Sequence, residues 1–151
     1  MLITDTHTHL YAEEFDADRN NLITGAINKG VQKFFLPNID STSFDGLYKV
    51  CEAFPENCFP MMGLHPCSVK ENYKDELAKV ENELSKGLLS ERNKKFYALG
   101  EIGVDLYWDK TFVAQQSAAF ITQINWASEI KLPILIISFV ASSKGLLPER
   151  E

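Results

Sequence analysis

The chain of 151 residues alternates short apolar runs with longer segments in which apolar residues recur at helical spacing. The runs, each suited to a β-strand, lie at residues 2–4, 31–36, 59–64, 96–102 and 132–137. Each of the first four runs is followed by apolar residues at helical spacing. These segments are residues 16–29, the set Leu47, Val50, Cys51 and Phe54, and residues 72–85 and 112–130. Because strand-then-helix units with short connections form parallel strands with right-handed crossovers, this alternation predicts an α/β fold.

Two architectures fit five such strands, an open doubly wound sheet and the first five strands of a (β/α)8 TIM barrel. The phosphate-binding patterns G-x-G-x-x-G and G-x-x-x-x-G-K-[ST] are both absent from the sequence. A dinucleotide-binding domain of the Rossmann type is therefore disfavoured. The apolar pattern by itself leaves the choice between the open sheet and the barrel undecided.

The first strand leads into Asp5-Thr6-His7-Thr8-His9, which holds two histidines two residues apart. In an extended segment, residues i and i+2 face the same side about 6–7 Å apart. His7 and His9 can therefore converge on one metal ion, and Asp5 can orient one of the rings from behind. Taken alone, the pair is also compatible with two histidines that share a strand by chance.

The other chemically distinctive side chains also follow or end predicted strands. His65 follows the third run in Gly63-Leu64-His65-Pro66, and Glu101 lies near the end of the fourth. In a parallel barrel the carboxyl ends of the strands form one face, where active sites assemble. All three histidines of the chain are placed in this way, which favours a metal site. The simpler alternatives are a Glu101 that caps the following loop and a His65 that is packed by Pro66.

The composition of the chain restricts its expected partners and its expected location in the cell. A net charge of −6 argues against a broad basic surface for nucleic acid, although an enzyme can bring positive charge with a bound metal. The three cysteines, Cys51, Cys58 and Cys67, form no paired framework and favour a reducing compartment. The first residues lack a signal-peptide pattern, and the longest apolar run, residues 132–137, is too short to span a bilayer. We therefore expect a cytoplasmic protein that does not contact a membrane.

Three motifs in order, D-T-H-T-H-L, G-L-H-P and G-E-I-G-V-D, resemble those of the TatD family of metal-dependent deoxyribonucleases, which are amidohydrolase-type barrels. The similarity runs from Leu2 to about Ile136. It implies a (β/α)8 TIM barrel that binds one or two divalent cations, such as Mg²⁺, Mn²⁺ or Zn²⁺. It also implies an enzyme that hydrolyses phosphodiester bonds of DNA.

Carried over residue by residue, the resemblance implies that His7, His9 and Glu101 are metal ligands. His65 and Asp105 lie in the family motifs near the substrate and are the candidate catalytic residues. A divalent ion lowers the pKa of bound water toward about 7, and two ions about 3.5–4 Å apart can stabilise both the attacking and the leaving oxygen. A Cys67–His65 nucleophile pair is disfavoured, because two residues on one turn do not easily reach each other in a productive geometry.

The sequence departs from the family pattern at its end. The resemblance implies a histidine after the fifth strand, where Ile137 stands, and further ligands on a sixth and an eighth strand. A typical barrel has about 250 residues. We therefore expect a member truncated after about five strands, for instance by a changed reading frame near Ile137. The predicted domains are a partial barrel over residues 1–137 and a non-family tail over residues 138–151.

A barrel cut after its fifth strand has two open strand edges. Such edges pair with other chains, so the sequence predicts self-association. It also predicts low or no activity for this chain alone. Two alternatives to the deoxyribonuclease remain at this stage, an amide or lactone hydrolase of the same barrel class and a non-catalytic, degenerate domain that acts by association.

Overall fold

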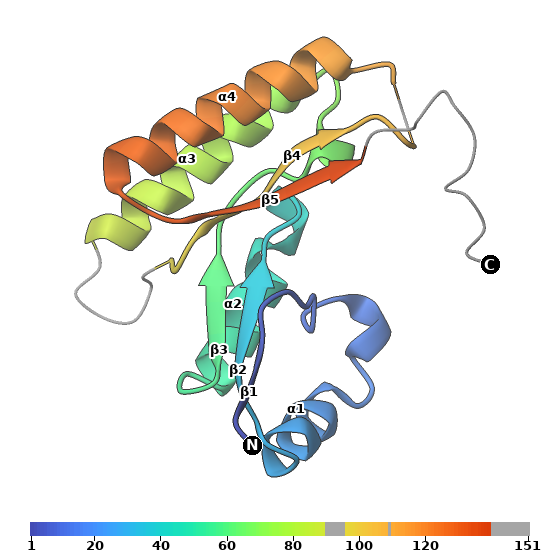
Figure 1. The fold of residues 1–151 in the computed structure, drawn as a ribbon, viewed down its shortest axis with the longest axis vertical. Coiled ribbons are helices and arrows are strands. Elements are labelled where there is room, and N and C mark those ends of the chain that lie inside the picture. Colours follow the sequence, from blue (N-terminus) through green and yellow to red (C-terminus); the bar gives the residue numbers. More distant parts are fainter. Residues whose placement is uncertain (90–95, 109, 140–151) are drawn as a thin grey trace, which may run out of the picture.

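The structure, a computed structural model, describes residues 1–89, 96–108 and 110–139. Its strands are β1 (Ile3–Asp5), β2 (Val31–Pro37), β3 (Cys58–Met61), β4 (Leu99–Asp105) and β5 (Ile134–Phe139). Its α-helices are α1 (Arg19–Asn28), α2 (Phe44–Ala53), α3 (Tyr73–Leu89) and α4 (Val113–Ile130). Three short 3-10 turns accompany them, η1 (Glu13–Phe15), η2 (Ser41–Ser43) and η3 (Pro66–Ser68). The predicted alternation of strands and helices is confirmed (Figure 1).

The five strands are parallel and follow one another in chain order. β1, β2 and β3 form one sheet, and β4 pairs with β5 in a second. A parallel bridge between Met62 and Leu99 joins the two sheets. Sequential parallel strands with helical crossovers are the arrangement of a (β/α) barrel, so the barrel and not the doubly wound sheet is the architecture of the described residues.

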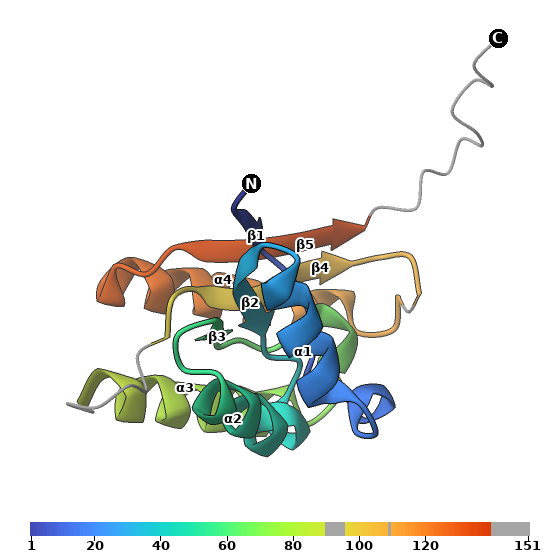
Figure 2. The same cartoon turned by 90° about the horizontal axis from the view of Figure 1, so that it is seen from below.

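The helices cover the strands from outside. α1 contacts β2, α2 contacts β3, α4 contacts β4, and α3 lies along α4 (Figure 1). Seen from below, β4 and β5 run along one side and α2 and α3 along the other, with β2 and β3 between them (Figure 2). The core contains fully buried Leu36, Leu64, Leu99 and Ile102, which pack the strands against these helices.

Two glycines allow close approaches of the backbone. Gly30 follows α1 with a φ of +105°, a conformation that favours glycine at the end of a helix, and a Cβ there would lie 2.8 Å from the carbonyl oxygen of Met1. Gly103 in β4 has a φ of +154°, and a Cβ there would lie 1.7 Å from the carbonyl oxygen of Ile137. The pairing of β4 with β5 therefore requires glycine at position 103.

Several predicted details are wrong. The fourth strand begins at Leu99 and ends at Asp105, because its pairing with β5 runs through residues 102–105. Glu101 therefore lies within the first half of β4 and not at its end. The pattern Thr42-Ser43-Phe44-Asp45 predicts a capping box that begins at Thr42, and the structure does not contain it. Asp40 is the cap instead, because its side chain accepts from the backbone N–H of Thr42, and its own backbone N–H donates to the hydroxyl oxygen of Ser43.

The apolar spacing over residues 112–130 predicts that Val113, Phe120, Ile124 and Ala127 face the sheet, but the inner face of α4 is different. The buried residues are Gln116, Ala119, Gln123 and Ala127. The two glutamines are buried because their amides satisfy backbone groups at the strand ends. Gln123 hydrogen-bonds both the N–H and the carbonyl oxygen of Leu64, and Gln116 accepts from the N–H of Asp105.

No helix in the part of the chain that the structure describes is long and apolar enough to cross a membrane. The predicted division between a domain over residues 1–137 and a tail over residues 138–151 stays a prediction, since residues 140–151 lie outside the described residues.

Candidate metal centre

The segment that carries the histidine pair lies just beyond β1. The strand ends at Asp5, two residues earlier than a strand through His7 would require. The carboxylate of Asp5 accepts a hydrogen bond from the backbone N–H of His7 at 3.1 Å, and the N–H of Thr8 donates to the carbonyl oxygen of Phe35 in β2. Asp5 therefore holds the backbone of His7, and not an imidazole ring as the sequence suggested.

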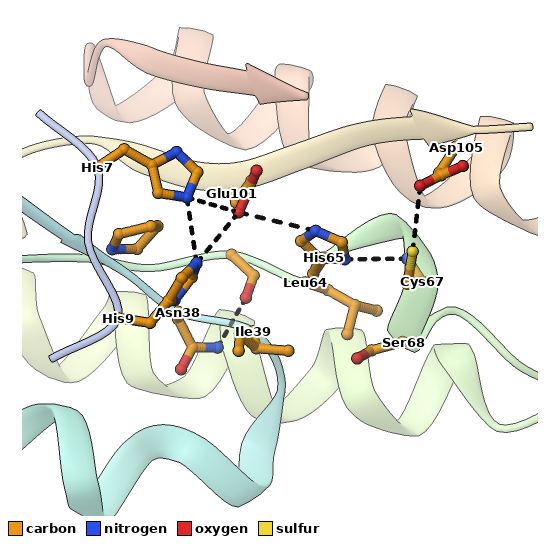
Figure 3. Close-up of polar contacts among 12 residues, drawn as sticks. His7, His9, Asn38, Ile39, Leu64, His65, Cys67, Ser68, Glu101 and Asp105 are labelled. Carbon is orange, nitrogen blue, oxygen red and sulfur yellow. Dashed lines mark hydrogen bonds and ion pairs between the residues drawn. The ribbon is translucent and has the colours of Figure 1, made fainter. Parts of the chain in front are cut away.

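His7 and His9, from the segment after β1, and Glu101, from β4, converge on one point (Figure 3). Nε2 of His7 lies 3.1 Å from Nε2 of His9 and 3.2 Å from Oε2 of Glu101. Nε2 of His9 lies 3.7 Å from the same carboxylate oxygen. The sequence predicted that these three residues meet, and they do so although Glu101 comes from the middle of the chain.

These distances suit one metal ion. Two ligand atoms that each bind a tetrahedral ion at about 2.1 Å are separated by about 3.4 Å. The three measured separations, 3.1, 3.2 and 3.7 Å, lie around that value. Two imidazole nitrogens and one carboxylate oxygen are also a donor set that divalent metals accept. The residues present therefore fit a divalent cation.

Glu101 is the buried member of the group, with 2% of its side chain exposed, whereas 39% of the His7 side chain is exposed. Burial by itself raises the pKa of the Glu101 carboxyl group, but the neighbouring histidine side chains lower it below its ordinary value. Glu101 is consequently a carboxylate at neutral pH, which is the form that binds metal ions.

His65 also reaches this carboxylate. It precedes η3, and its Nε2 lies 3.7 Å from Oε2 of Glu101. Its Nδ1 accepts a hydrogen bond from the backbone N–H of Cys67 at 3.0 Å. A neutral imidazole that accepts at Nδ1 carries its proton on Nε2. Burial lowers the pKa of His65, so the ring faces Glu101 as a neutral N–H donor.

Asp105 lies at the end of β4 and contacts no histidine directly. Its Oδ2 accepts from the thiol of Cys67 at 3.3 Å, and its Oδ1 accepts from the backbone N–H groups of Tyr107 at 2.8 Å and Trp108 at 3.4 Å. Contacts between neighbours thus run from His7 through Glu101, His65 and Cys67 to Asp105 (Figure 3). Asp105 connects the loop that carries His65 to the end of β4.

Cys67 is unsuited to nucleophilic attack. Burial and the hydrogen bond with Asp105 raise the pKa of its thiol to about 11, so it is protonated at neutral pH. The part of Cys67 that His65 contacts is the backbone N–H and not the thiol, and this contact occupies Nδ1 of His65. The geometry therefore agrees with the sequence-based rejection of a Cys67–His65 pair.

Two further residues at the strand ends were missed by the sequence analysis. Tyr11, which is buried, contacts the ring of His9, and the fully buried Asn38 follows β2 and donates to the carbonyl oxygen of Gly63. The period of two residues that links His7 to His9 continues to Tyr11 and could have identified it. Asn38 could have been found as the polar residue that follows the second strand.

Comparisons with known proteins identify relatives of this fold and site. Residues 4–138 match a protein family described as TatD related DNase. An uncharacterized metal-dependent hydrolase of Bacillus subtilis, YabD, is 30% identical over 135 residues, which are 89% of this chain and 50% of the relative. A 3'-5' ssDNA/RNA exonuclease TatD of Pantoea ananatis is 28% identical over 132 residues, which are 87% of this chain and 48% of the relative.

A solved structure is similar as well. The crystal structure of YjjV, a TatD homologue from Escherichia coli K12, matches with a TM-score of 0.78 and 26% identity. The match covers 90% of this chain and 50% of that one. The chain thus spans about half the length of the relatives it matches.

Proposed function

Because the chain belongs to the TatD related DNase family, we propose that its cluster of His7, His9 and Glu101 binds one or two divalent metal ions, Mg²⁺, Mn²⁺ or Zn²⁺, for the hydrolysis of phosphodiester bonds in DNA. The observation that carries the proposal is the approach of two Nε2 atoms and one ionised carboxylate to within 4.8 Å of one another. A bound divalent ion would lower the pKa of a water molecule and stabilise negative charge on the phosphate.

The side chains around the cluster have separate roles in this proposal. His65 holds a proton on Nε2 beside Glu101, so it donates a hydrogen bond to an oxygen of the scissile phosphate. Asp105 is a positioning residue, because both of its oxygens are engaged by Cys67 and by the backbone that follows β4. It therefore fixes the loop that presents His65.

An aromatic pair supports a nucleic acid as the substrate. Tyr107 and Trp108 follow β4 with 60% and 77% of their surfaces exposed, and their rings meet edge to face at 4.8 Å. Asp105 holds the backbone of both residues. Exposed aromatic rings bind single-stranded nucleic acids by stacking on the bases, whatever the base sequence. A relative from Pantoea ananatis is named as an ssDNA/RNA exonuclease, which agrees with such a substrate.

The 151 residues by themselves have low activity in this proposal. Ile137, in β5, stands where the resemblance implies a further histidine ligand, and all three histidines of the chain already contact Glu101. A site with three protein ligands binds a metal ion less tightly than one that is completed by further side chains. The same observation favours the second candidate, a non-catalytic domain that associates with other chains through its strand edges.

The cellular location is proposed on chemical grounds. All three cysteines are free thiols, and burial raises the pKa of both Cys51 and Cys58 to about 12. Proteins without disulfides are typical of the reducing cytoplasm, and we propose that this chain functions there.

A nuclease assay tests the proposal. Single-stranded DNA labelled at one end is incubated with the chain and Mg²⁺, Mn²⁺ or Zn²⁺, beside the variants His7→Ala and Glu81→Gln. Glu81 is an exposed carboxylate on α3, remote from the histidines in sequence, and serves as the control. Metal-dependent cleavage that is lost only in His7→Ala supports the proposal.

Other outcomes of the assay select the alternatives. Cleavage of amide or lactone substrates without cleavage of DNA would indicate a different hydrolase of the same fold. Metal binding without hydrolysis of any of these substrates would favour the non-catalytic domain. Cleavage of DNA that is insensitive to both metal and His7→Ala would contradict the metal site itself.

A further inference from the structure

The hydrogen bonds around His9 determine which of its ring nitrogens carries the proton. The hydroxyl group of Tyr11 lies 2.5 Å from the carbonyl oxygen of Pro37 and 2.8 Å from Nδ1 of His9. A carbonyl oxygen only accepts hydrogen bonds, so the single proton of the Tyr11 hydroxyl is donated to Pro37. The contact with His9 is then possible only if Nδ1 of His9 donates to the tyrosine oxygen.

The consequence lies on the other side of the ring. A neutral imidazole with its proton on Nδ1 has a lone pair on Nε2. This Nε2 is the atom that faces Glu101 at 3.7 Å and His7 at 3.1 Å. A metal ligand must present a lone pair, and a second residue that holds the opposite N–H usually orients a ligating histidine.

We propose that Tyr11 is a positioning residue that locks His9 as the Nδ1–H tautomer, with Nε2 available for the metal ion. This inference rests on the proposed metal site. It adds to that site a hydroxyl group that no family motif contained, since the resemblance rests on D-T-H-T-H-L, which ends at Leu10.

The same reasoning assigns different protonation to the other two histidines. Because Nε2 of His9 is an acceptor, the contact of 3.1 Å requires Nε2 of His7 to donate, so His7 carries its proton on Nε2. Nδ1 of His65 accepts from the N–H of Cys67, so His65 also carries its proton on Nε2. His9 is thus prepared as a ligand, His7 must first move its proton to Nδ1, and His65 remains a donor.

The surroundings of Tyr11 hold this residue in a fixed position beside His9. Its side chain is buried, with 7% of the residue exposed, and its ring meets the His9 ring edge to face at 5.6 Å. The backbone carbonyl of Tyr11 accepts from the guanidinium group of Arg19 in α1 at 3.1 Å. Pro37 therefore holds the phenol of Tyr11, while Arg19 holds the backbone of the same residue.

The test measures the tautomers directly in the metal-free full chain. Two-bond ¹H–¹⁵N NMR spectra of protein labelled at histidine, recorded at about pH 8, where an ordinary imidazole is neutral, distinguish Nδ1–H from Nε2–H. The chain has only three histidines, so each signal can be assigned by substitution. We expect His9 as Nδ1–H and both His7 and His65 as Nε2–H.

The variant Tyr11→Phe removes only the hydroxyl group. We expect His9 to lose its preference for Nδ1–H while His65 keeps Nε2–H, and the affinity for Zn²⁺, measured against a competing chelator, to fall about 10- to 100-fold. Tyr48→Phe is the matched control, because the Tyr48 hydroxyl donates to Glu83 at 2.7 Å, away from the histidines. It should leave both readouts unchanged.

The outcomes separate this inference from the proposed function. A wild-type His9 with its proton on Nε2, a tautomer that survives Tyr11→Phe, or an unchanged Zn²⁺ affinity would overturn the role of Tyr11. If Tyr11→Phe does not fold, the wild-type spectrum alone still decides the tautomer. A wild-type chain that shows the expected tautomers and binds none of the three metals would instead refute the metal site.

Discussion

Oε2 of Glu101 lies 3.7 Å from Nε2 of His65, although the two residues come from different strand units and only Glu101 is fully buried. The same oxygen lies within reach of His7 and His9. One carboxylate therefore faces all three histidines of the chain, two of them proposed as ligands and one as a donor. The three rings should respond differently to substitution.

The first prediction compares His65→Ala with His9→Ala. Because Nδ1 of His65 is occupied by the Cys67 amide and its Nε2 carries a proton, removing this ring should leave Zn²⁺ affinity close to that of the wild type. DNA cleavage should fall about 100-fold, as expected for the loss of one hydrogen bond to developing charge. His9→Ala should lose metal affinity as well. A His65→Ala variant that binds metal as poorly as His9→Ala would make His65 a ligand.

The second prediction concerns Cys67. Burial and Asp105 raise the pKa of its thiol to about 11, so Cys67→Ser, which retains a hydroxyl donor for Asp105, should cleave DNA at the wild-type rate. Alkylation of the wild-type chain by iodoacetamide should be slower than that of a free cysteine by on the order of 100-fold. Rapid alkylation together with loss of cleavage in Cys67→Ser would restore a nucleophilic role.

The third prediction is a pH dependence of stability. Glu76 is buried in α3, and its carboxylate accepts from Lys79 at 2.7 Å and from both the N–H and the hydroxyl of Ser41 at 3.0 Å. Burial raises its pKa, but these contacts outweigh burial and lower the pKa below its ordinary value. The contribution of Glu76 to stability is therefore present above about pH 4.3 and is lost as the pH falls through the lowered value.

Glu76→Gln should accordingly reduce the free energy of unfolding by about 1–2 kcal/mol at neutral pH, and the difference from the wild type should shrink below about pH 4. Urea denaturation at several pH values measures this difference. Glu81→Gln, on the exposed side of the same helix, is the control and should show little change at any pH. If the difference in the free energy of unfolding persisted unchanged in acid, Glu76 would stabilise the fold through its shape and not through its charge.

The sequence predicted the strand order and the meeting of His7, His9 and Glu101, because both depend on patterns within short segments. The spacing of His7 and His9 and the position of Glu101 in its motif are visible in the residues themselves. The contacts of Tyr11 and Asn38 depend instead on how β1, β2 and β3 lie beside one another. The bounds of β4 were predicted three residues too early, because they are fixed by pairing with β5, which lies about 35 residues further along the chain.

The burial of two glutamines in α4 also depends on other elements and could not be predicted from helical spacing. Gln116 and Gln123 were not among the residues predicted to face the sheet, since glutamine is usually exposed. Their burial is explained only by the backbone groups of Asp105 and Leu64 that they satisfy, and these groups come from other elements. Helical spacing identified the helix, while long-range hydrogen bonding decided which of its faces points inward.

The fourth prediction tests the nature of the substrate. Trp108→Ala should raise the KM for a single-stranded oligonucleotide about 5- to 150-fold, which corresponds to the stacking energy of one base, about 1–3 kcal/mol. An abasic oligonucleotide of the same length should show no such change. Ile121→Ala, at an exposed apolar position of α4, is the control. An equal effect on both oligonucleotides would mean that Trp108 supports the loop and does not contact bases.

The last prediction concerns the open edge of the sheet. Among the described strands β5 pairs only with β4, and it exposes 39% of Ile134 and 51% of Ile136. An apolar strand with unpaired backbone groups is a template for pairing with another chain, so the 151-residue chain should self-associate. Ile136→Lys places a charge on this edge and should shift the sedimentation profile toward the monomer, whereas Ile121→Lys, at a site on α4 that is 59% exposed, should leave it unchanged. A wild-type chain that sediments as a monomer at all concentrations would show that the β5 edge does not pair.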